Sequence, residues 1–172
     1  MARVELITER HEHLTDAQKE TFDAVVASRG KMIRPFEVLT HTPVIGGAIA
    51  DVGGKLRYGS LLSDHDRELL TLTVGADSGC AFVWDSHIDL GQRFGVREEV
   101  LAHLRDGADV TFEPHEDLVV SSVRQLLATR TVDDEHFEAL VELYGVQGAI
   151  EFSATVGYYV LLATVMGFAQ AC

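Results

Sequence analysis

Three residues near the middle of the sequence could carry out proton or thiol chemistry together: Glu68, Cys80 and His87. Cys80 and His87 are seven positions apart, nearly two turns of an α-helix, so both side chains are expected on one helix face. Cys80 would lie in the first turn after a break at Asp77–Gly79, where the helix dipole favours a thiolate, although the charge of Asp77 opposes this. Glu68 lies among apolar residues, where a carboxyl group can act as an acid or a base. The spacing therefore indicates acid–base or thiol chemistry in one pocket.

Each of these three residues also has an ordinary structural interpretation. Single cysteines are most often buried apolar side chains, and glutamates on helices are most often solvated. Spacing alone leaves both interpretations open.

Helix signals run along nearly the whole chain. Thr15 and Gln18 have the spacing of a capping box, and Gly30 is typical of a helix end. Pro35 and Pro43 stand where prolines open helices. About eight helices are expected, at approximately 16–30, 43–58, 63–75, 80–94, 97–105, 114–130, 133–144 and 146–171.

The segment 63–75 carries two competing signals. Ser63 precedes an acidic first turn, which favours a helix. Residues 69–74 alternate apolar residues with Thr, as a strand does. A helix is favoured here, and no hairpin turn lies between alternating segments elsewhere in the chain. The expected fold class is all-α.

The composition restricts the partners of the protein. Its 172 residues are 47% hydrophobic and 24% charged, as in a soluble globular domain. The net charge of −13 disfavours binding to nucleic acids and to anionic membrane surfaces. Two cysteines indicate a reducing compartment, and the N-terminus lacks the apolar core of a secretory signal. A cytoplasmic location is therefore expected.

The C-terminal segment 149–171 has the length and apolar character of a membrane anchor. Glu151, Ser153 and Thr155 interrupt it, however, and small residues such as Gly157 suit close helix packing. We therefore expect a buried core helix or a subunit-interface helix rather than an anchor.

The residues around the three candidates resemble a known family. Arg67-Glu68-Leu69, the run Gly79–His87, and Gly95 followed by Glu98-Glu99-Val100 are similar to the carboxymuconolactone decarboxylase and alkylhydroperoxidase D superfamily. The pattern of that superfamily is Glu, eleven residues, then Cys-x-x-Cys-x-x-x-His, and Val83 here takes the place of the second Cys. Residues 156–159 and several N-terminal positions resemble its longer branch, whose motif is Cys-x-Tyr-x-Trp-x-x-His, with Phe82 here in place of the Tyr.

This resemblance implies one all-helical domain over residues 1–172, with the motif core at 57–105 and the alkylhydroperoxidase D-like bundle as its fold. It also implies a homo-oligomer, a trimer or a hexamer, that acts on a small-molecule substrate. It implies no cofactor.

The valine at position 83 bears on which of two reactions known in the similar family this chain could catalyse. The peroxidase branch needs two neighbouring thiols, so only a one-cysteine peroxidase at Cys80, regenerated by an external thiol, remains as an alternative. The decarboxylase branch needs a His that protonates a developing carbanion. We favour acid–base chemistry, with His87 as the proton donor or acceptor and Glu68 orienting it or sharing the proton. A non-catalytic oligomer that binds a small ligand is a second alternative.

The resemblance also proposes residues for the walls of the pocket. Cys80, Phe82, Val83 and Trp84 would line it. Arg57 is a candidate for binding a substrate carboxylate, with a surface ion pair as the alternative. Tyr158 or Tyr159 could donate a hydrogen bond across the pocket, with core packing as the alternative.

The other histidines do not predict a metal site. His11 and His13 form a pair near an end that is expected to fray, which makes a poor site. The remaining five are scattered, without partners at helical spacing: His41, His65, His103, His115 and His136.

Overall fold

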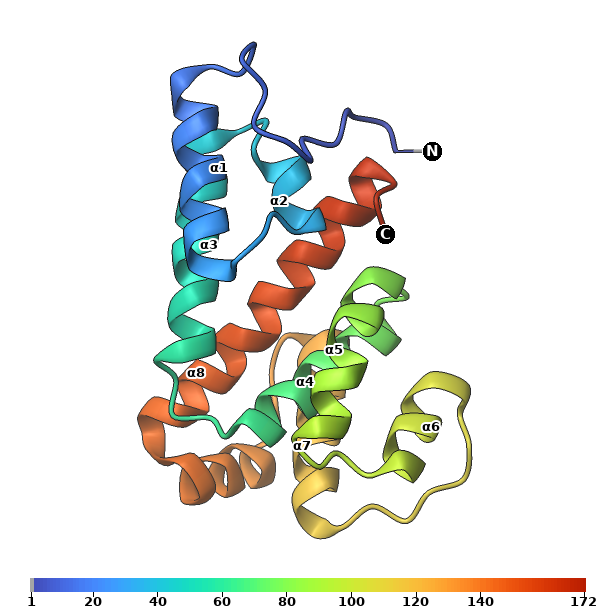
Figure 1. Ribbon diagram of the computed structural model, residues 1–172. Helices are drawn as coiled ribbons and strands as arrows, with labels where there is room; N and C mark the ends of the chain where they lie inside the picture. The colour runs from blue at the N-terminus through green and yellow to red at the C-terminus, as the bar shows by residue number, and fades with distance from the viewer. Residues whose placement is uncertain (1) are drawn as a thin grey trace. The chain divides into compact units, whose positions relative to one another are not determined.

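The chain folds into eight helices, with no strand among residues 2–172, which are the residues that the computed structural model describes (Figure 1). This confirms the predicted all-α class. In chain order the helices are α1 (Asp16–Arg29), α2 (Arg34–Leu39), α3 (Pro43–Tyr58), α4 (Asp64–Asp77), α5 (Ala81–Arg93), α6 (Glu98–Asp106), α7 (Pro114–Thr129) and α8 (Asp134–Ala169).

Local capping signals account for the helix boundaries. The Thr15 side chain accepts a hydrogen bond from the Gln18 backbone, and the Gln18 side chain accepts one from the Thr15 backbone, which is the predicted capping box. Gly30 ends α1 in the left-handed conformation, with a φ of 77°. Pro35 and Pro43 lie in the first turns of α2 and α3, where a missing N–H is tolerated.

Helix α4 forms where the sequence carries competing helix and strand signals. Ser63 accepts a hydrogen bond from the Asp66 backbone at 3.0 Å and so caps the helix. Thr71 and Thr73 are fully buried, and their hydroxyls donate to backbone carbonyls of α4 at 2.7 Å and 2.8 Å. The strand-like threonines are therefore satisfied within their own helix, which lets α4 be buried on several faces.

The described chain divides into two compact units. The first contains the residues up to Gly59 and the terminal segment Thr164–Cys172. Within it, α3 packs against α1 and α2, and the guanidinium of Arg29 lies 4.6 Å above the ring of Phe36. The Arg3 backbone donates to the carbonyl of Ala169 at 2.8 Å, so the N-terminal segment is tied to the last helical turn of the chain.

The second unit contains Ser60–Ala163 and is built around α4. Helix α4 packs against α5, α6 and α7, and its leucines 69, 70 and 72 are fully buried. Gly75 lets α5 approach closely, because a Cβ there would lie 3.1 Å from the Trp84 backbone nitrogen. This unit contains Glu68, Cys80 and His87.

Helix α8 differs from the predicted pair of helices at its centre. The structure has one long element, but Gly145 within it has a φ of 71° and a ψ of 170°, which are not helical. The predicted break between Tyr144 and Val146 is therefore present as a kink that needs glycine. Among the described residues α8 alone has the length and apolar composition of a membrane span, and 44% of its most apolar window is buried.

Candidate active site

A buried hydrogen bond between Glu68 and His87 joins α4 to α5. The Nδ1 of His87 donates to Oε2 of Glu68 at 2.6 Å. The exposed fraction is 0% for Glu68 and 8% for His87. A hydrogen bond at Nδ1 fixes the orientation of the imidazole and leaves Nε2 on the side of the ring away from Glu68. The structure thus brings together two of the three residues that the sequence singles out.

The second carboxylate oxygen of Glu68 is less well satisfied. Oε1 is buried without a hydrogen-bond partner among the described residues. The nearest cation is Arg67, whose Nε lies 3.7 Å away, and Arg67 also forms an ion pair with Asp64. A buried acceptor without a donor is costly, so Oε1 is suited to accept a hydrogen bond from a bound molecule.

A tyrosine ring also contacts the histidine. The ring of Tyr159 meets the ring of His87 edge to face, with the centroids 5.2 Å apart. Tyr158, the predicted substrate-binding residue, instead has its ring edge to face with Tyr159 at 5.3 Å. Of the two tyrosines weighed from the sequence, Tyr159 is therefore the one in ring contact with His87.

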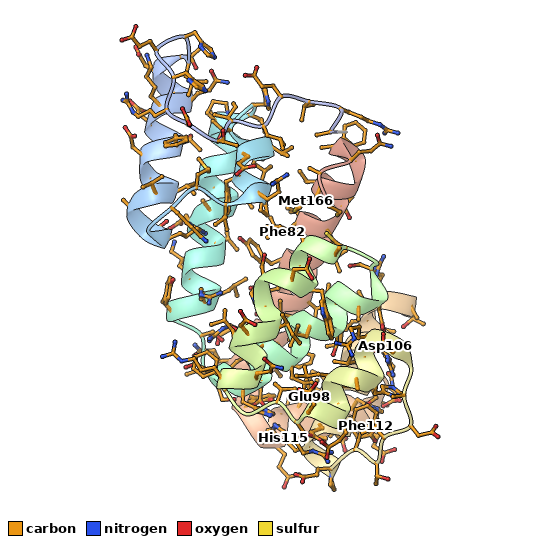
Figure 2. The ribbon with its side chains drawn as sticks, turned by 45° about the vertical axis from the view of Figure 1, so that its right-hand side comes forward. Phe82, Glu98, Asp106, Phe112, His115 and Met166 are labelled. Carbon is orange, nitrogen blue, oxygen red and sulfur yellow. The ribbon has the colours of Figure 1, made fainter. Side chains whose placement is uncertain are left out.

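Cys80 caps α5 and lies one residue before the first helical position. Its backbone nitrogen donates to the carbonyl of Gly75 at 3.2 Å, and its exposed fraction is 2%. Val83, at the position of the second family cysteine, is also 2% exposed. Phe82 and Trp84 are partly exposed in the same first turns of α5, where Figure 2 labels Phe82. These placements suit apolar walls, and their contact with a substrate stays a prediction.

Arg57 lies in the last turn of α3, in the first unit. Its guanidinium carbon is 6.0 Å from the centre of the Tyr58 ring. Its predicted role in holding a substrate carboxylate stays a prediction.

A second group of polar residues, which the sequence analysis treats as scattered, converges in the second unit. Oδ1 of Asp66 accepts from Nδ1 of His65 at 2.9 Å and from Nε2 of His115 at 2.6 Å. Oδ2 of Asp66 accepts from the hydroxyl of Tyr144 at 2.9 Å. We call His65, Asp66 and His115 the histidine–aspartate cluster. Helical spacing gives no sign of it, because the residues come from α4 and α7 and are brought together only by helix packing.

The electrostatics of this cluster follow from its hydrogen bonds. Burial raises the pKa of Asp66, but the donors from His65, His115, Ser63 and Tyr144 outweigh burial and hold the pKa of this carboxyl well below its usual range. Burial and the nearby charge of Asp66 raise the pKa of Tyr144 far above its usual value. Asp66 is therefore a carboxylate, and Tyr144 is a neutral donor to it.

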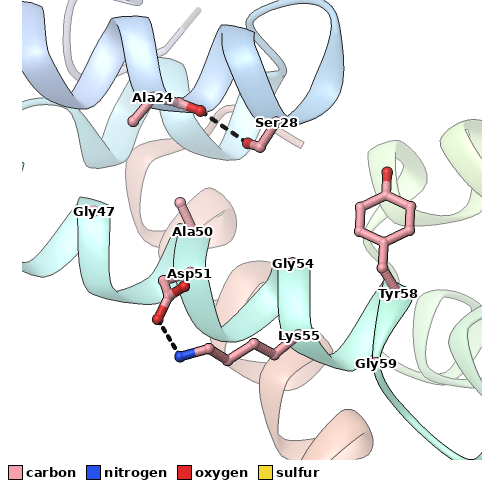
Figure 3. Close-up of a pocket in the computed structure, with 9 residues that line it drawn as sticks. All are labelled: Ala24, Ser28, Gly47, Ala50, Asp51, Gly54, Lys55, Tyr58 and Gly59. Carbon is pink, nitrogen blue, oxygen red and sulfur yellow. Dashed lines mark hydrogen bonds and ion pairs between the residues drawn. The ribbon is translucent and has the colours of Figure 1, made fainter.

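An open pocket of ≈ 470 Å³ lies in the first unit and holds none of the predicted site residues (Figure 3). It is lined by residues of α1 and α3, among them Ala24, Gly47 and Gly54. Its charged groups are Asp51 and Lys55, which form an exposed ion pair at 2.7 Å. The lining is therefore mostly apolar, and its two charged side chains are paired with each other.

Comparison with known proteins gives one family match. Residues 43–116 match the model of the carboxymuconolactone decarboxylase family. The matched segment runs from the first residue of α3 into the first turn of α7 and includes Glu68, Cys80 and His87. A search of the curated proteins gave no match.

Proposed function

Since residues 43–116 match the model of the carboxymuconolactone decarboxylase family, we propose that the protein is an enzyme that uses His87 and Glu68 for acid–base chemistry on a small organic acid or lactone. The observation that carries this proposal is the 2.6 Å hydrogen bond between Nδ1 of His87 and the fully buried Glu68. A carboxylate in this position holds the imidazole in one orientation, with Nδ1 toward Glu68 and Nε2 directed away from it.

In the proposed reaction His87 acts through Nε2. The bond between the substrate carbon and its carboxylate breaks, carbon dioxide leaves, and the electron pair is delocalised as an enolate. The protonated imidazole then delivers its Nε2 proton to that carbon, and solvent restores the proton. In an isomerisation the neutral imidazole would take a proton from one carbon and return it to another.

The surroundings of His87 support a small and largely apolar substrate. Tyr159 covers one side of the imidazole, and Val83 is an aliphatic side chain where the family pattern has a thiol. Oε1 of Glu68 is a buried acceptor that could receive a hydroxyl of the substrate. Without a second thiol at position 83, the two-cysteine peroxide chemistry of the family has no counterpart in α5.

The test compares wild type with His87→Gln and Glu68→Gln on a panel of small carboxylated lactones and β-keto acids in deuterated water. Product formation and deuterium incorporation are followed by proton NMR. We expect turnover with deuterium at the former carboxyl-bearing carbon in wild type. We expect a loss of about 10²–10⁴-fold in kcat for His87→Gln, because the glutamine amide still donates to Glu68 but cannot deliver a proton.

Controls distinguish this proposal from its alternatives. His136→Ala changes a histidine of α8 whose ring contacts Asp133 instead, so its turnover should equal that of wild type. Peroxide consumption with a thiol reductant that disappears in Cys80→Ser would replace the proposal with a thiol-dependent peroxidase that acts through Cys80. Ligand binding without turnover, unchanged in His87→Gln, would make the protein a binding oligomer.

A further inference from the structure

The histidine–aspartate cluster directs three ligand-type atoms at one point. One candidate ligand atom from each of His65, Asp66 and His115 lies within 4.8 Å of the other two. Oδ1 of Asp66 is 2.9 Å from Nδ1 of His65 and 2.6 Å from Nε2 of His115. Ligand atoms of a tetrahedral site with metal bonds of about 2.0–2.2 Å lie about 3.3–3.6 Å apart, so the side chains would have to separate by about 0.4–1 Å to admit an ion.

The cluster is also accessible to an ion. The side chains of His65 and His115 are 29% and 39% exposed, whereas that of Asp66 is 6% exposed. Both imidazoles are therefore partly exposed to solvent, whereas the carboxylate that they share is buried. In Figure 2, His115 lies at the opposite end of the second unit from Phe82.

The groups around the cluster hold its ligands in place. The hydroxyl of Tyr144, from α8, donates to the oxygen of Asp66 that the histidines do not use. Asp64 and Glu116 lie beside the cluster in the first turns of α4 and α7, and such acids offset the positive ends of the two helix dipoles. Arg97 is ion-paired with Glu116, and Arg67 is ion-paired with Asp64.

The chain contains a histidine–aspartate contact of the ordinary structural kind for comparison. His136 donates to Asp133 at 2.7 Å within the first turn of α8, and no second imidazole of the described chain joins them there. In the cluster, by contrast, two imidazoles from two helices share one carboxylate oxygen. A carboxylate oxygen has two lone pairs and can accept both hydrogen bonds, so what distinguishes the cluster is that a second helix supplies a second imidazole to the same oxygen.

We propose that His65, Asp66 and His115 bind a divalent first-row transition-metal ion such as Zn²⁺, with Tyr144 orienting the carboxylate ligand. Two imidazoles and one carboxylate are a common ligand set for such ions and leave coordination positions for water. The site is separate from the acid–base pair, because Asp66 and Glu68 are two positions apart on α4 and so project about 200° apart around the helix. The ion would crosslink α4 to α7.

The first experiment titrates tag-free, chelator-treated full-length protein with Zn²⁺ by calorimetry. One ion per chain is expected for wild type. His65→Ala and His115→Ala should each abolish that binding, and Tyr144→Phe should weaken it by about 10–100-fold, as is usual for the loss of a hydrogen bond to a ligand. His136→Ala, and the double change of His11 and His13 to Ala, should retain wild-type affinity.

A second measurement does not depend on the folding of any variant. X-ray absorption at the zinc edge of the loaded wild-type protein should report two imidazole nitrogens and a carboxylate oxygen at about 2.0–2.2 Å. A sulfur ligand, or fewer than two imidazoles, would overturn the proposal. So would the absence of stoichiometric binding, or binding that persists in His65→Ala and His115→Ala.

Discussion

Three carboxylates lie buried in the second unit, and the number of donors around each indicates its role. Glu116 receives two hydrogen bonds from Arg97 and one from the Glu113 backbone, and the Arg97 hydrogen bonds lower its pKa. Asp66 receives hydrogen bonds from two histidines and a tyrosine. Glu68 receives only the hydrogen bond of His87, and its other oxygen has no partner among the described residues. Glu68 is thus the carboxylate with capacity left for a bound molecule.

An exposed residue supplies the clearest dependence on pH. The backbone N–H of His136 donates to Asp133 at 2.9 Å, its ring does so at 2.7 Å, and Gln125 adds a third hydrogen bond. These donors lower the pKa of Asp133 from 3.8 to about 2. A lowered pKa adds stability above the unfolded value, so this contribution should be lost as the pH falls from 3.8 toward about 2.

The measurement is a carboxyl-carbon NMR titration together with thermal unfolding between pH 5 and pH 2. Asp133→Asn lacks this carboxylate, so its unfolding temperature should decrease less between pH 5 and pH 2 than that of wild type. A titration midpoint near 4 for Asp133 would contradict the expectation.

At the scale of the helix, sequence reasoning succeeds where local signals decide and stops where packing decides. The capping box of Thr15 and the stop at Gly30 are local, and both are confirmed. The predicted joint action of Glu68 and His87 rests on a family pattern, because Glu68 lies on α4 and His87 on α5. The histidine–aspartate cluster could not be predicted, because His115 and Asp66 are 49 positions apart and only the packing of α7 on α4 joins them.

Two glycines in the second unit test the helix packing. A Cβ at Gly75 would lie 3.1 Å from the Trp84 backbone and 3.1 Å from the Val83 side chain, whereas a Cβ at Gly157 would meet nothing within 4 Å. Gly75→Ala should therefore destabilise the protein by about 1–3 kcal/mol, because α4 and α5 must separate. Gly157→Ala should stabilise it by up to about 1 kcal/mol through helix propensity.

Urea unfolding of wild type and the two variants measures this difference. Changes of the same sign at Gly75 and Gly157 would show that the close approach of α4 and α5 does not limit stability.

At the scale of the whole molecule, apolar side chains remain uncovered on α3. Val44 is 83% exposed and Ile45 is 57% exposed, and Val52 and Tyr58 are exposed on the same helix. Apolar residues gathered on one element usually mark an interface. Because self-association closes such surfaces in pairs or rings, we expect the protein to form the trimer or hexamer that its family resemblance implies.

Light scattering after size exclusion tests this expectation against the chain mass of 18.9 kDa. Wild type should have three or six times that mass, and the double variant Val44→Glu with Ile45→Glu should have a lower mass. Thr131→Glu, at an exposed position between α7 and α8, should not change it. A monomeric wild type would contradict the expectation.

Helix α4 also constrains how this chain can change in length. Asp66 faces the histidine of α7 and Glu68 faces that of α5. Inserting or deleting one residue between them would turn one partner about 100° away from its own histidine. Descendants of this chain can therefore gain or lose residues in the connection 107–113, but the stretch from Asp66 to Glu68 must be inherited at constant length.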